Sequence, residues 1–261
     1  MSPDVSQDAS GRATVILPCA GRGSRLGLPF PKELLPLGPG RTPLDATLEL
    51  ILPHADRLRL LVVTDSTRQP TIAHILRAAK GRLPVAFVPQ LPDLPETVGA
   101  VLSAQAWFSD RNLCLLPDQV LDTPRDGLIP DALALLDGAG FCFVASPETN
   151  PERLSRDGAL RLNCATPPRV TGYAEHPRQA DAASFNAVWF AFAFRAETAP
   201  AVLPLMHHAV CGTAVSDADL AASPLYGCPA LTVGPYHDTG TWPAVLELWR
   251  DQRPEHSQEQ R

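Results

Sequence analysis

The sequence has very few lysines. Only Lys32 and Lys80 are present among 22 basic residues, the rest being arginine, against 28 acidic residues and a formal net charge of −6. A net negative, lysine-poor chain lacks the dense basic face that general nucleic-acid binding requires, so we expect no nucleic-acid partner. A ligand with anionic groups would therefore have to be bound by a few cations gathered in one place.

Long apolar runs and paired cysteine motifs are also missing. No segment approaches the roughly 18 uninterrupted apolar residues that suggest a membrane helix, and residues 1–12 are polar rather than secretory. We therefore expect no membrane association and a cytoplasmic location. The six cysteines are scattered without a C-x-x-C pair, which disfavours a zinc site or a disulfide framework. Cys19, Cys114, Cys142 and Cys164 lie in or beside apolar runs, and we expect them to be small buried residues.

Apolar runs and segments with helical spacing alternate along the chain, which is 45% hydrophobic and so able to build a core. The pattern predicts strands at 14–19, 58–64, 85–88, 112–116 and 141–146, and helices at 43–52, 69–79, 96–107 and 128–136. The strand runs are apolar on both faces, as buried parallel strands are. This alternation predicts an α/β fold with helices on both faces of the sheet.

The second half of the chain is less regular. It contains a long apolar segment at 185–194, expected to be a central strand, and a further strand at 230–233. Helices are expected at 197–207 and 243–249. We expect a disordered arm at 1–12, one domain over 13–251, and a disordered tail at 252–261.

The most informative segment follows the first strand and reads VILPCAGRGSRLGLPFPKELLPLG over residues 15–38. Glycines allow a tight turn that aims several N–H groups inward, which forms a concavity suited to phosphate oxygens. Arg25 can hold such oxygens bidentately, and Lys32 can act on the same group as a point charge. The alternative is a glycine-bearing surface turn with exposed cations.

Two familiar phosphate-binding loops do not fit this segment. A Walker A loop requires Ser or Thr directly after its lysine, and Glu33 stands there. A dinucleotide-binding loop requires G-x-G-x-x-G opening a helix, but Gly21, Gly23 and Gly27 are spaced one residue too widely and prolines follow. An NAD-type oxidoreductase, with Asp45 on the ribose, is therefore the weakest alternative.

Two aspartates follow later strands. Asp118 comes directly after the apolar run at 112–116, where a carboxylate at the end of a parallel strand points into the ligand crevice. A turn or helix-cap aspartate is the alternative. Asp238 lies in YHDTGTWP, and its alternative role is an Asx turn before the final helix.

Taken together, these motifs resemble the signature of the sugar-1-phosphate nucleotidyltransferases. The segment matches G-x-G-[ST]-R-[LM] followed by P-K-x-L-x-P-[LV], and Asp118 and the D-T-G-T at residues 238–241 match the two later acidic motifs. The resemblance covers about residues 13–250. It implies a single Rossmann-like α/β/α domain with a mixed, mainly parallel central sheet, of the nucleotide-diphospho-sugar transferase type.

The resemblance also implies roles for individual residues. In the triphosphate-binding half, at 13–120, it implies catalytic roles for Arg25, Lys32 and Asp118. In the same half it implies that the NTP is bound by Ala20, Gly21, Gly23, Ser24, Gln90 and Gly99. Gln90 and Gly99 would contact the nucleobase. Asp118 and Asp238 would coordinate Mg²⁺, which prefers oxygen ligands and often takes one or two carboxylates. In the acceptor-binding half, at 121–251, the implied residues are Glu175, His176, Arg178 and Asn186.

Some positions depart from the family pattern. Relatives often have E-K-P, whose lysine grips the sugar phosphate, whereas His176 stands at the lysine position here. A histidine is only partly cationic near neutral pH, so Arg178 could supply the charge instead. Gln119 follows Asp118 where relatives often have a second acid or Asn, and the gap between Arg25 and Lys32 is short.

The leading hypothesis is an Mg²⁺-dependent transfer of a nucleotidyl group from an NTP to a sugar-1-phosphate or sugar-like phosphate, releasing pyrophosphate and forming an NDP-sugar. The alternative is a catalytically weak or inactive protein of the same fold that acts as a nucleotide sensor or scaffold, since Gln119 and His176 depart from the pattern. The sequence identifies neither the base nor the acceptor, and it leaves a homo-oligomer open.

Overall fold

The computed structural model describes residues 11–21, 25–38 and 40–251 of the chain. Most of the predicted arm and all of the predicted tail lie outside the described residues, as do Gly23 and Ser24 of the glycine loop. Among the described helices, none combines the length and the apolar character needed to cross a membrane.

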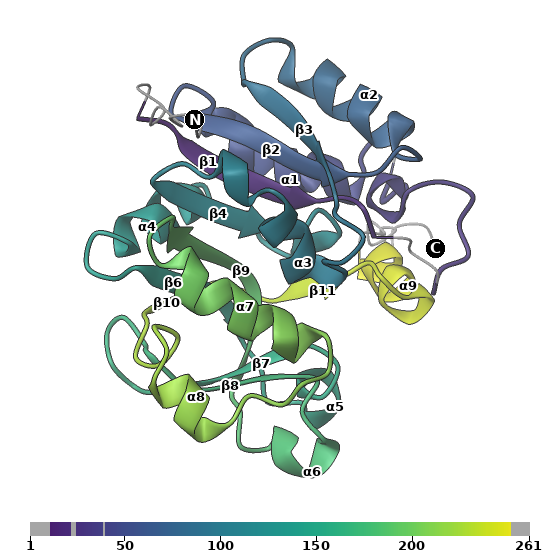
Figure 1. The fold of residues 1–261 in the computed structure, drawn as a ribbon. Coiled ribbons are helices and arrows are strands. Elements are labelled where there is room, and N and C mark those ends of the chain that lie inside the picture. Colours follow the sequence, from purple (N-terminus) through teal and green to yellow (C-terminus); the bar gives the residue numbers. More distant parts are fainter. Residues whose placement is uncertain (1–10, 22–24, 39, 252–261) are drawn as a thin grey trace, which may run out of the picture.

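A mixed sheet runs through the middle of the molecule (Figure 1), with strand order β10-β6-β9-β4-β1-β2-β3. Its strands are β1 (Ala13–Pro18), β2 (Leu58–Thr64), β3 (Val85–Pro89), β4 (Arg111–Leu115), β6 (Phe141–Pro147), β9 (Ala187–Arg195) and β10 (Ala230–Thr232). β1 pairs in parallel with β2 and β4, and β2 pairs in parallel with β3. β9 is central, as expected, and runs antiparallel to β4 and β6. The predicted mixed, mainly parallel α/β sheet is confirmed.

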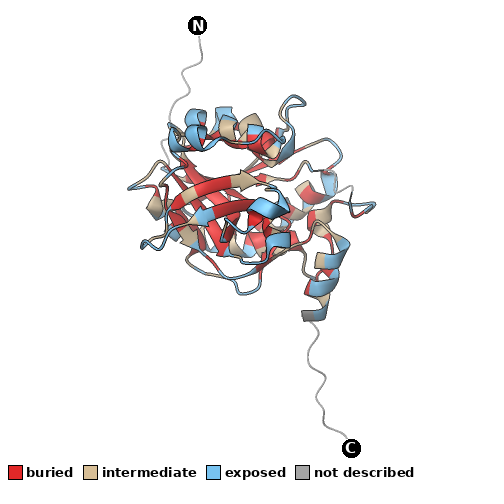
Figure 2. Ribbon diagram, turned by 90° about the horizontal axis from the view of Figure 1, so that it is seen from below, coloured by how far each residue is buried: buried red, intermediate tan, exposed pale blue. Residues whose placement is uncertain are grey.

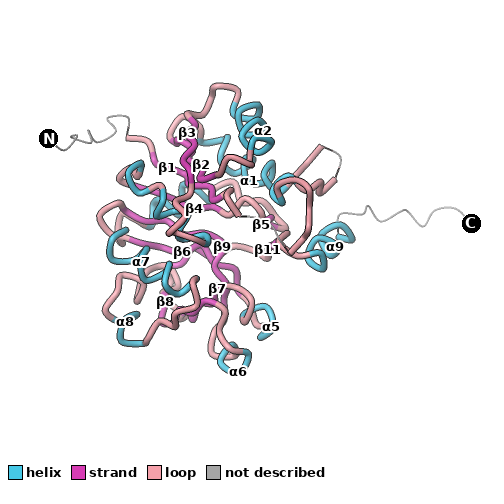
Figure 3. Tube along the Cα trace, turned by 45° about the vertical axis from the view of Figure 1, so that its right-hand side comes forward, coloured by secondary structure: helices cyan, strands magenta, loops and turns pink. Residues whose placement is uncertain are grey.

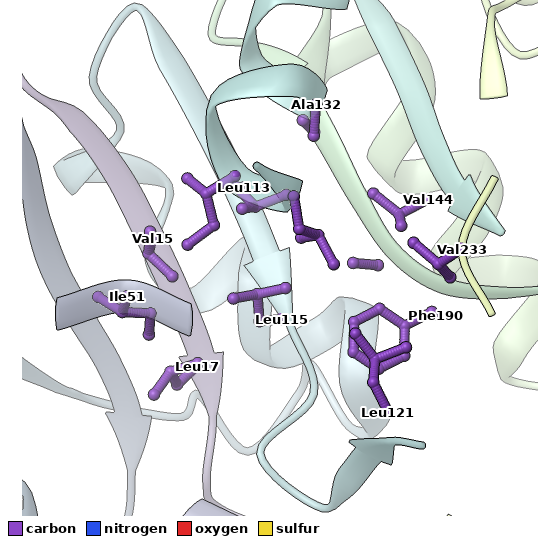
Figure 4. Close-up of a cluster of buried hydrophobic side chains, with 14 of the residues drawn as sticks. Val15, Leu17, Ile51, Leu113, Leu115, Leu121, Ala132, Val144, Phe190 and Val233 are labelled. Carbon is purple, nitrogen blue, oxygen red and sulfur yellow. The ribbon is translucent and has the colours of Figure 1, made fainter. Parts of the chain in front are cut away.

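Helices cover both faces of this sheet. One face carries α1 (Pro43–Ile51), α2 (Gln69–Ala79) and α4 (Leu128–Leu135), and the other carries α3 (Glu96–Ser103), α7 (Ala199–Val210) and α8 (Asp217–Ala221). Alternation along β1 explains the two layers, because Val15 and Leu17 face the first group whereas Ile16 faces the second. Figure 2 shows the result, with buried residues concentrated in the strands between more exposed helices. Figure 4 shows part of the first layer, in which Val15, Leu113 and Phe190 lie in one apolar cluster.

Shorter elements surround these layers. They are β5 (Gln119–Leu121), β7 (Gly158–Leu162), β8 (Val170–Glu175), β11 (Tyr236–Asp238), α5 (Pro151–Leu154), α6 (Gln179–Ala182), α9 (Trp242–Asp251), and the 3₁₀ turns η1 (Lys32–Leu34), η2 (Leu52–His54) and η3 (Gln105–Trp107). β7 joins the sheet beside β9 and pairs with β8. β5 pairs only with β11, in a separate antiparallel ribbon of the described chain. The sequence pattern did not predict β5, β7, β8 or β11.

The start of α1 is a capping box. The Thr42 hydroxyl accepts a hydrogen bond from the Asp45 amide at 3.2 Å, and the Asp45 carboxylate accepts one from the Thr42 amide at 2.8 Å. Asp45 also lies 2.6 Å from the His74 ring. These contacts cap α1 and occupy the carboxylate that an NAD-binding loop would need for the ribose.

Two local predictions were wrong. The helix expected at 96–107 ends at Ser103, and a 3₁₀ turn follows it. At this end the Ser103 hydroxyl donates to the Gly99 carbonyl at 2.8 Å and accepts from the Leu91 amide at 2.9 Å. Cys164 is exposed rather than buried, because it lies in the turn between β7 and β8. Cys19, Cys114 and Cys142 are buried as predicted, and all six cysteines are free thiols.

Candidate active site

The four parallel strands β1, β2, β3 and β4 end at the same edge of the sheet. The chain leaves β1 through α1, on one face, and reaches β4 through α3, on the other face. Such a divergence of connections opens a crevice at the carboxyl ends of the two strands, where α/β proteins bind ligands. The glycine loop follows β1 and Asp118 follows β4, so both candidate segments border this crevice.

Lys32 reaches across the crevice to Asp118. Prolines at positions 29 and 31 prevent a longer helix here, so Lys32 begins the single turn η1. Its ammonium forms an ion pair with the Asp118 carboxylate. The charge of Asp118 raises the pKa of Lys32 and outweighs the opposing effect of burial. Arg25 and Gly21 of the glycine loop are exposed, and Ala20 is partly buried.

A short ribbon brings the two aspartates together. β5 and β11 pair antiparallel, with Asp238 opposite Gln119, and Figure 3 shows the pair near α9. The Asp118 carbonyl accepts hydrogen bonds from the Thr239 amide at 2.9 Å and from the Thr239 hydroxyl at 2.8 Å. Burial, and then the negative charge of Asp118, raise the pKa of Asp238. The two carboxylates therefore share one electrostatic environment, beside Lys32.

The D-x-G spacing has a steric cause. The Gly240 amide donates to Asp238 Oδ1 at 2.7 Å, which is the Asx turn that the sequence offered as a structural role for this aspartate. A Cβ on residue 240 would lie 2.8 Å from the same oxygen. A side chain at residue 240 would therefore push Asp238 Oδ1 away, whereas the turn to Gly240 holds that oxygen.

The pair of carboxylates fits Mg²⁺ in its chemistry. Burial raises the pKa of Asp238 and the charge of Asp118 raises it further, and a divalent cation would relieve that repulsion. The described residues contain no cluster of three or more His, Cys, Asp or Glu side chains able to hold a metal ion. A metal held here would therefore take two carboxylates from the protein and its other ligands from phosphate oxygens and water, as Mg²⁺ commonly does.

Two further charged residues lie at this edge, and neither was expected there from the sequence. Glu33 directly follows Lys32 and is fully buried, and Arg68 lies between β2 and α2 with 6% of its surface exposed. The buried thiol of Cys19, directly after β1, lies in the electric field of these groups. Burial, and then the charges of Glu33 and Asp118, raise its pKa, while Arg68 and Lys32 oppose that rise. Glu33 could have been suspected from its place beside Lys32, whereas no pattern marks Arg68.

Gln90 and Gly99, expected at the base, lie close together. The Gln90 amide nitrogen donates to the Leu94 carbonyl at 2.7 Å and to the Glu96 carbonyl at 3.2 Å. A Cβ on residue 99 would lie 2.4 Å from the same Leu94 oxygen. Both residues therefore shape the loop after β3, and the Gln90 amide hydrogens are already engaged.

On the acceptor side, Glu175 and Asn186 are hydrogen-bonded within the fold. Glu175 Oε1 accepts from the Tyr173 hydroxyl at 2.7 Å and from Trp189 Nε1 at 2.8 Å. Asn186 is exposed, and its amide group bonds both the N–H and the C=O of Leu162, at 2.8 and 2.9 Å. These contacts tie β8 to β9 and the end of β7 to the segment before β9.

His176 and Arg178 are exposed on the same side. His176 has a positive φ of 48°, and its amide donates to the Asp157 carbonyl at 3.3 Å. Burial raises the pKa of Asp157, against the charges of Arg153 and His176. Arg153 lies 3.4 Å from Glu148 and 3.7 Å from Asp157, and its guanidinium stacks over the Tyr236 ring. The sequence did not point to this Arg153 cluster.

The fold matches solved nucleotidyltransferases. The UTP-bound UGPase from Acinetobacter baumannii aligns with a TM-score of 0.69 at 17% identity, over 94% of this chain and 95% of that one. A UDP-glucose pyrophosphorylase complexed with UDP-glucose aligns with a TM-score of 0.70 at 16% identity, over 92% and 98%. A protein described as the mannose-1-phosphate geranyltransferase from Thermus thermophilus gives 0.63 at 25% identity, over 95% and 81%.

No protein-family model matches the sequence, and no curated protein resembles it closely enough to count as a match. At these identities the structural likeness establishes the fold. The fold expected from the motif resemblance is thus confirmed: the chain has the architecture of the sugar-1-phosphate nucleotidyltransferases.

Proposed function

We propose that this chain, which has the fold of the sugar-1-phosphate nucleotidyltransferases, transfers a nucleotidyl group from an NTP to a phosphorylated sugar or sugar-like alcohol. The observation that carries the proposal is the pairing of β5 with β11, which places Asp118 and Asp238 together beside Lys32. Two acids and a lysine, far apart in the sequence, converge where the glycine loop ends. A triphosphate with a divalent cation is the ligand that this charge arrangement suits.

In the proposed reaction, an oxygen of the acceptor phosphate attacks the α-phosphorus of the NTP in line. The new P–O bond forms as the bond between the α-phosphorus and its bridging oxygen breaks, and pyrophosphate leaves with the electron pair. The acceptor oxygen is already anionic at neutral pH, so no general base is required. Catalysis then comes from positioning and from neutralising charge on the phosphates.

This chain's own residues have distinct tasks in that scheme. The backbone N–H groups at Ala20 and Gly21 border the triphosphate site, and Arg25 and Lys32 supply positive charge to it. The proposal also includes Gly23 and Ser24, which lie outside the described residues. Asp118 and Asp238 would hold Mg²⁺, which when bound would neutralise triphosphate charge and favour departure of pyrophosphate.

For the remainder of the substrate, the proposal assigns Gln90 and Gly99 to the base and Glu175, His176, Arg178 and Asn186 to the acceptor. Gln90 and Glu175 are engaged in internal hydrogen bonds, so they would shape their subsites unless substrate displaces those bonds. His176 and Arg178 are exposed and carry or can acquire positive charge. They are the better candidates for contact with an acceptor phosphate.

The test is a pyrophosphate-release screen of five NTPs with Mg²⁺ against sugar, cyclitol and alcohol phosphates. We expect release that needs one NTP, one acceptor class and a divalent cation, and that is abolished by Asp118→Asn. The internal bonding of Gln90 and Glu175 favours the second candidate, a nucleotide-binding sensor of the same fold. NTP binding without pyrophosphate release for every acceptor would support that second candidate instead.

A further inference from the structure

Arg68 lies beside the glycine loop and has an unusual environment. Its side chain is 8% exposed, and its Nη2 donates a hydrogen bond to the Gly21 carbonyl. Its Nε makes no hydrogen bond within the described part of the chain, and the Asp65 carboxylate lies 3.9 Å away. Burying a guanidinium is costly unless its charge and donors are compensated. Here the buried group donates to the loop that borders the triphosphate site.

Glu33 is a second buried charged residue at this edge of the sheet. Its carboxylate, 1% exposed, accepts a hydrogen bond at 2.7 Å from the hydroxyl of Thr71, which lies in the first turns of α2. Burial raises the pKa of Glu33, while the Thr71 hydrogen bond and the charge of Arg68 act in the opposite direction. Glu33 is also the neighbour of Lys32 in η1. The carboxylate therefore ties the turn that carries Lys32 to the start of α2.

From these contacts we infer that Arg68 and Glu33 are positioning residues for the triphosphate site. Arg68 holds the glycine loop at Gly21, Glu33 holds the turn at Lys32, and both are anchored at the start of α2. The inference rests on the proposed function, because it assigns a purpose to two buried charged residues through the NTP. Gly21 has no side chain of its own, so the hydrogen bond from Arg68 to its carbonyl restrains the peptide at this residue.

The test compares NTP binding by the wild type, Arg68→Met and Arg68→Lys. Five NTPs are titrated with Mg²⁺ by calorimetry, and the one that binds the wild type is used for the variants. Arg68→Met is expected to weaken binding about tenfold or more, and to raise KM for the NTP with little change in KM for the acceptor. Arg68→Lys should restore part of the affinity, because it keeps the charge but cannot reproduce the donor geometry.

Two further variants keep the test decisive if Arg68→Met folds poorly. Thr71→Val removes the hydroxyl that binds Glu33 and leaves every charge in place; it should also weaken NTP binding, by a few fold. Arg195→Lys is the matched control, since Arg195 is partly buried, donates to the Leu136 carbonyl at 3.0 Å and pairs with Asp110 at the opposite edge of the sheet. It should lower thermal stability and leave NTP affinity unchanged.

The inference is overturned if Arg68→Met and Thr71→Val bind the NTP as tightly as the wild type. It is also overturned if the KM values for the NTP and the acceptor rise by the same factor, or if Arg195→Lys loses affinity to the same extent. A wild-type protein that binds none of the five NTPs contradicts the proposed function itself, which is a separate outcome.

Discussion

Replacing Lys32 with methionine should destabilise the protein in a way that Mg²⁺ reverses. The ammonium of Lys32 is paired with Asp118, and the two side chains are 26% and 12% exposed. Without this cation the charges of Asp118 and Asp238 lose their compensation, and burial together with the charge of Asp118 already raises the pKa of Asp238. The variant therefore contains a carboxylate pair that has lost its ammonium partner.

The size of the effect follows from the burial of the pair. Breaking a fully buried ion pair costs about 3–5 kcal/mol, and partial solvent access at Lys32 reduces this to about 1–3 kcal/mol. At roughly 2–4 °C per kcal/mol for a chain of this size, Lys32→Met should lower Tm by about 2–12 °C. Turnover should fall by at least about 10²-fold, because a preorganised cation at the phosphates is lost.

Thermal melts with and without Mg²⁺ measure the reversal. In the wild type a metal ion must approach the carboxylates against the charge of Lys32, so added Mg²⁺ should raise the Tm of Lys32→Met more than that of the wild type. Lys80→Met is the matched control, since Lys80 is the other lysine and lies exposed at the end of α2. If Lys32→Met and Lys80→Met respond alike to Mg²⁺ and turn over alike, the placement of Lys32 beside the two aspartates is refuted.

Three further predictions address other parts of the structure. Thr239→Val removes the hydroxyl that donates to the Asp118 carbonyl at 2.8 Å, so it should lower the free energy of unfolding by about 1–2 kcal/mol and also lower kcat. In the control Thr14→Val, which alters a buried threonine at the opposite edge of the sheet, only Tm should fall. Equal kcat values in the two variants would argue that the Thr239–Asp118 hydrogen bond does not position Asp118. Burial raises the pKa of Glu175 above its ordinary value of 4.5. The protonated side chain therefore contributes stability that is fully present below pH 4.5 and is lost as the pH rises through the pKa of the folded state. Glu175→Gln should therefore lose less stability than the wild type between pH 4.5 and neutral pH, and parallel Tm curves would contradict the shift. Cys164 and Cys211 are exposed while the other four thiols are buried, so a thiol reagent should label two cysteines rapidly in the native protein and six after denaturation; rapid labelling of a third would show that the core opens more easily than its packing suggests.

Local features of the fold were predictable from the sequence. β1 and α1 depend on neighbouring residues, and the apolar run at 14–19 and the helical spacing at 43–52 predict them directly. The short β5–β11 ribbon was not predictable from pattern, because three-residue strands carry no periodicity. The resemblance to the nucleotidyltransferases, rather than periodicity, linked Asp118 with Asp238.

The supporting contacts of the site were beyond sequence reasoning. Arg68 resembles any surface arginine in the sequence, and only the fold buries it against the Gly21 carbonyl. Glu175 was expected at the acceptor, but the sequence could not show that Tyr173 and Trp189 both donate to it. Such pairings depend on strand register across the sheet, which a single sequence does not specify.

The central claim is nucleotidyl transfer, and the fate of radiolabelled phosphorus tests it most directly. The protein is incubated with Mg²⁺, an acceptor phosphate and the NTP labelled at either the α or the γ position. We predict that the α label appears in a sugar-linked or alcohol-linked nucleoside diphosphate and the γ label in pyrophosphate, and that Asp118→Asn forms neither product. Appearance of the γ label in inorganic phosphate or in the acceptor, with the α label left in a free nucleotide, would contradict the account.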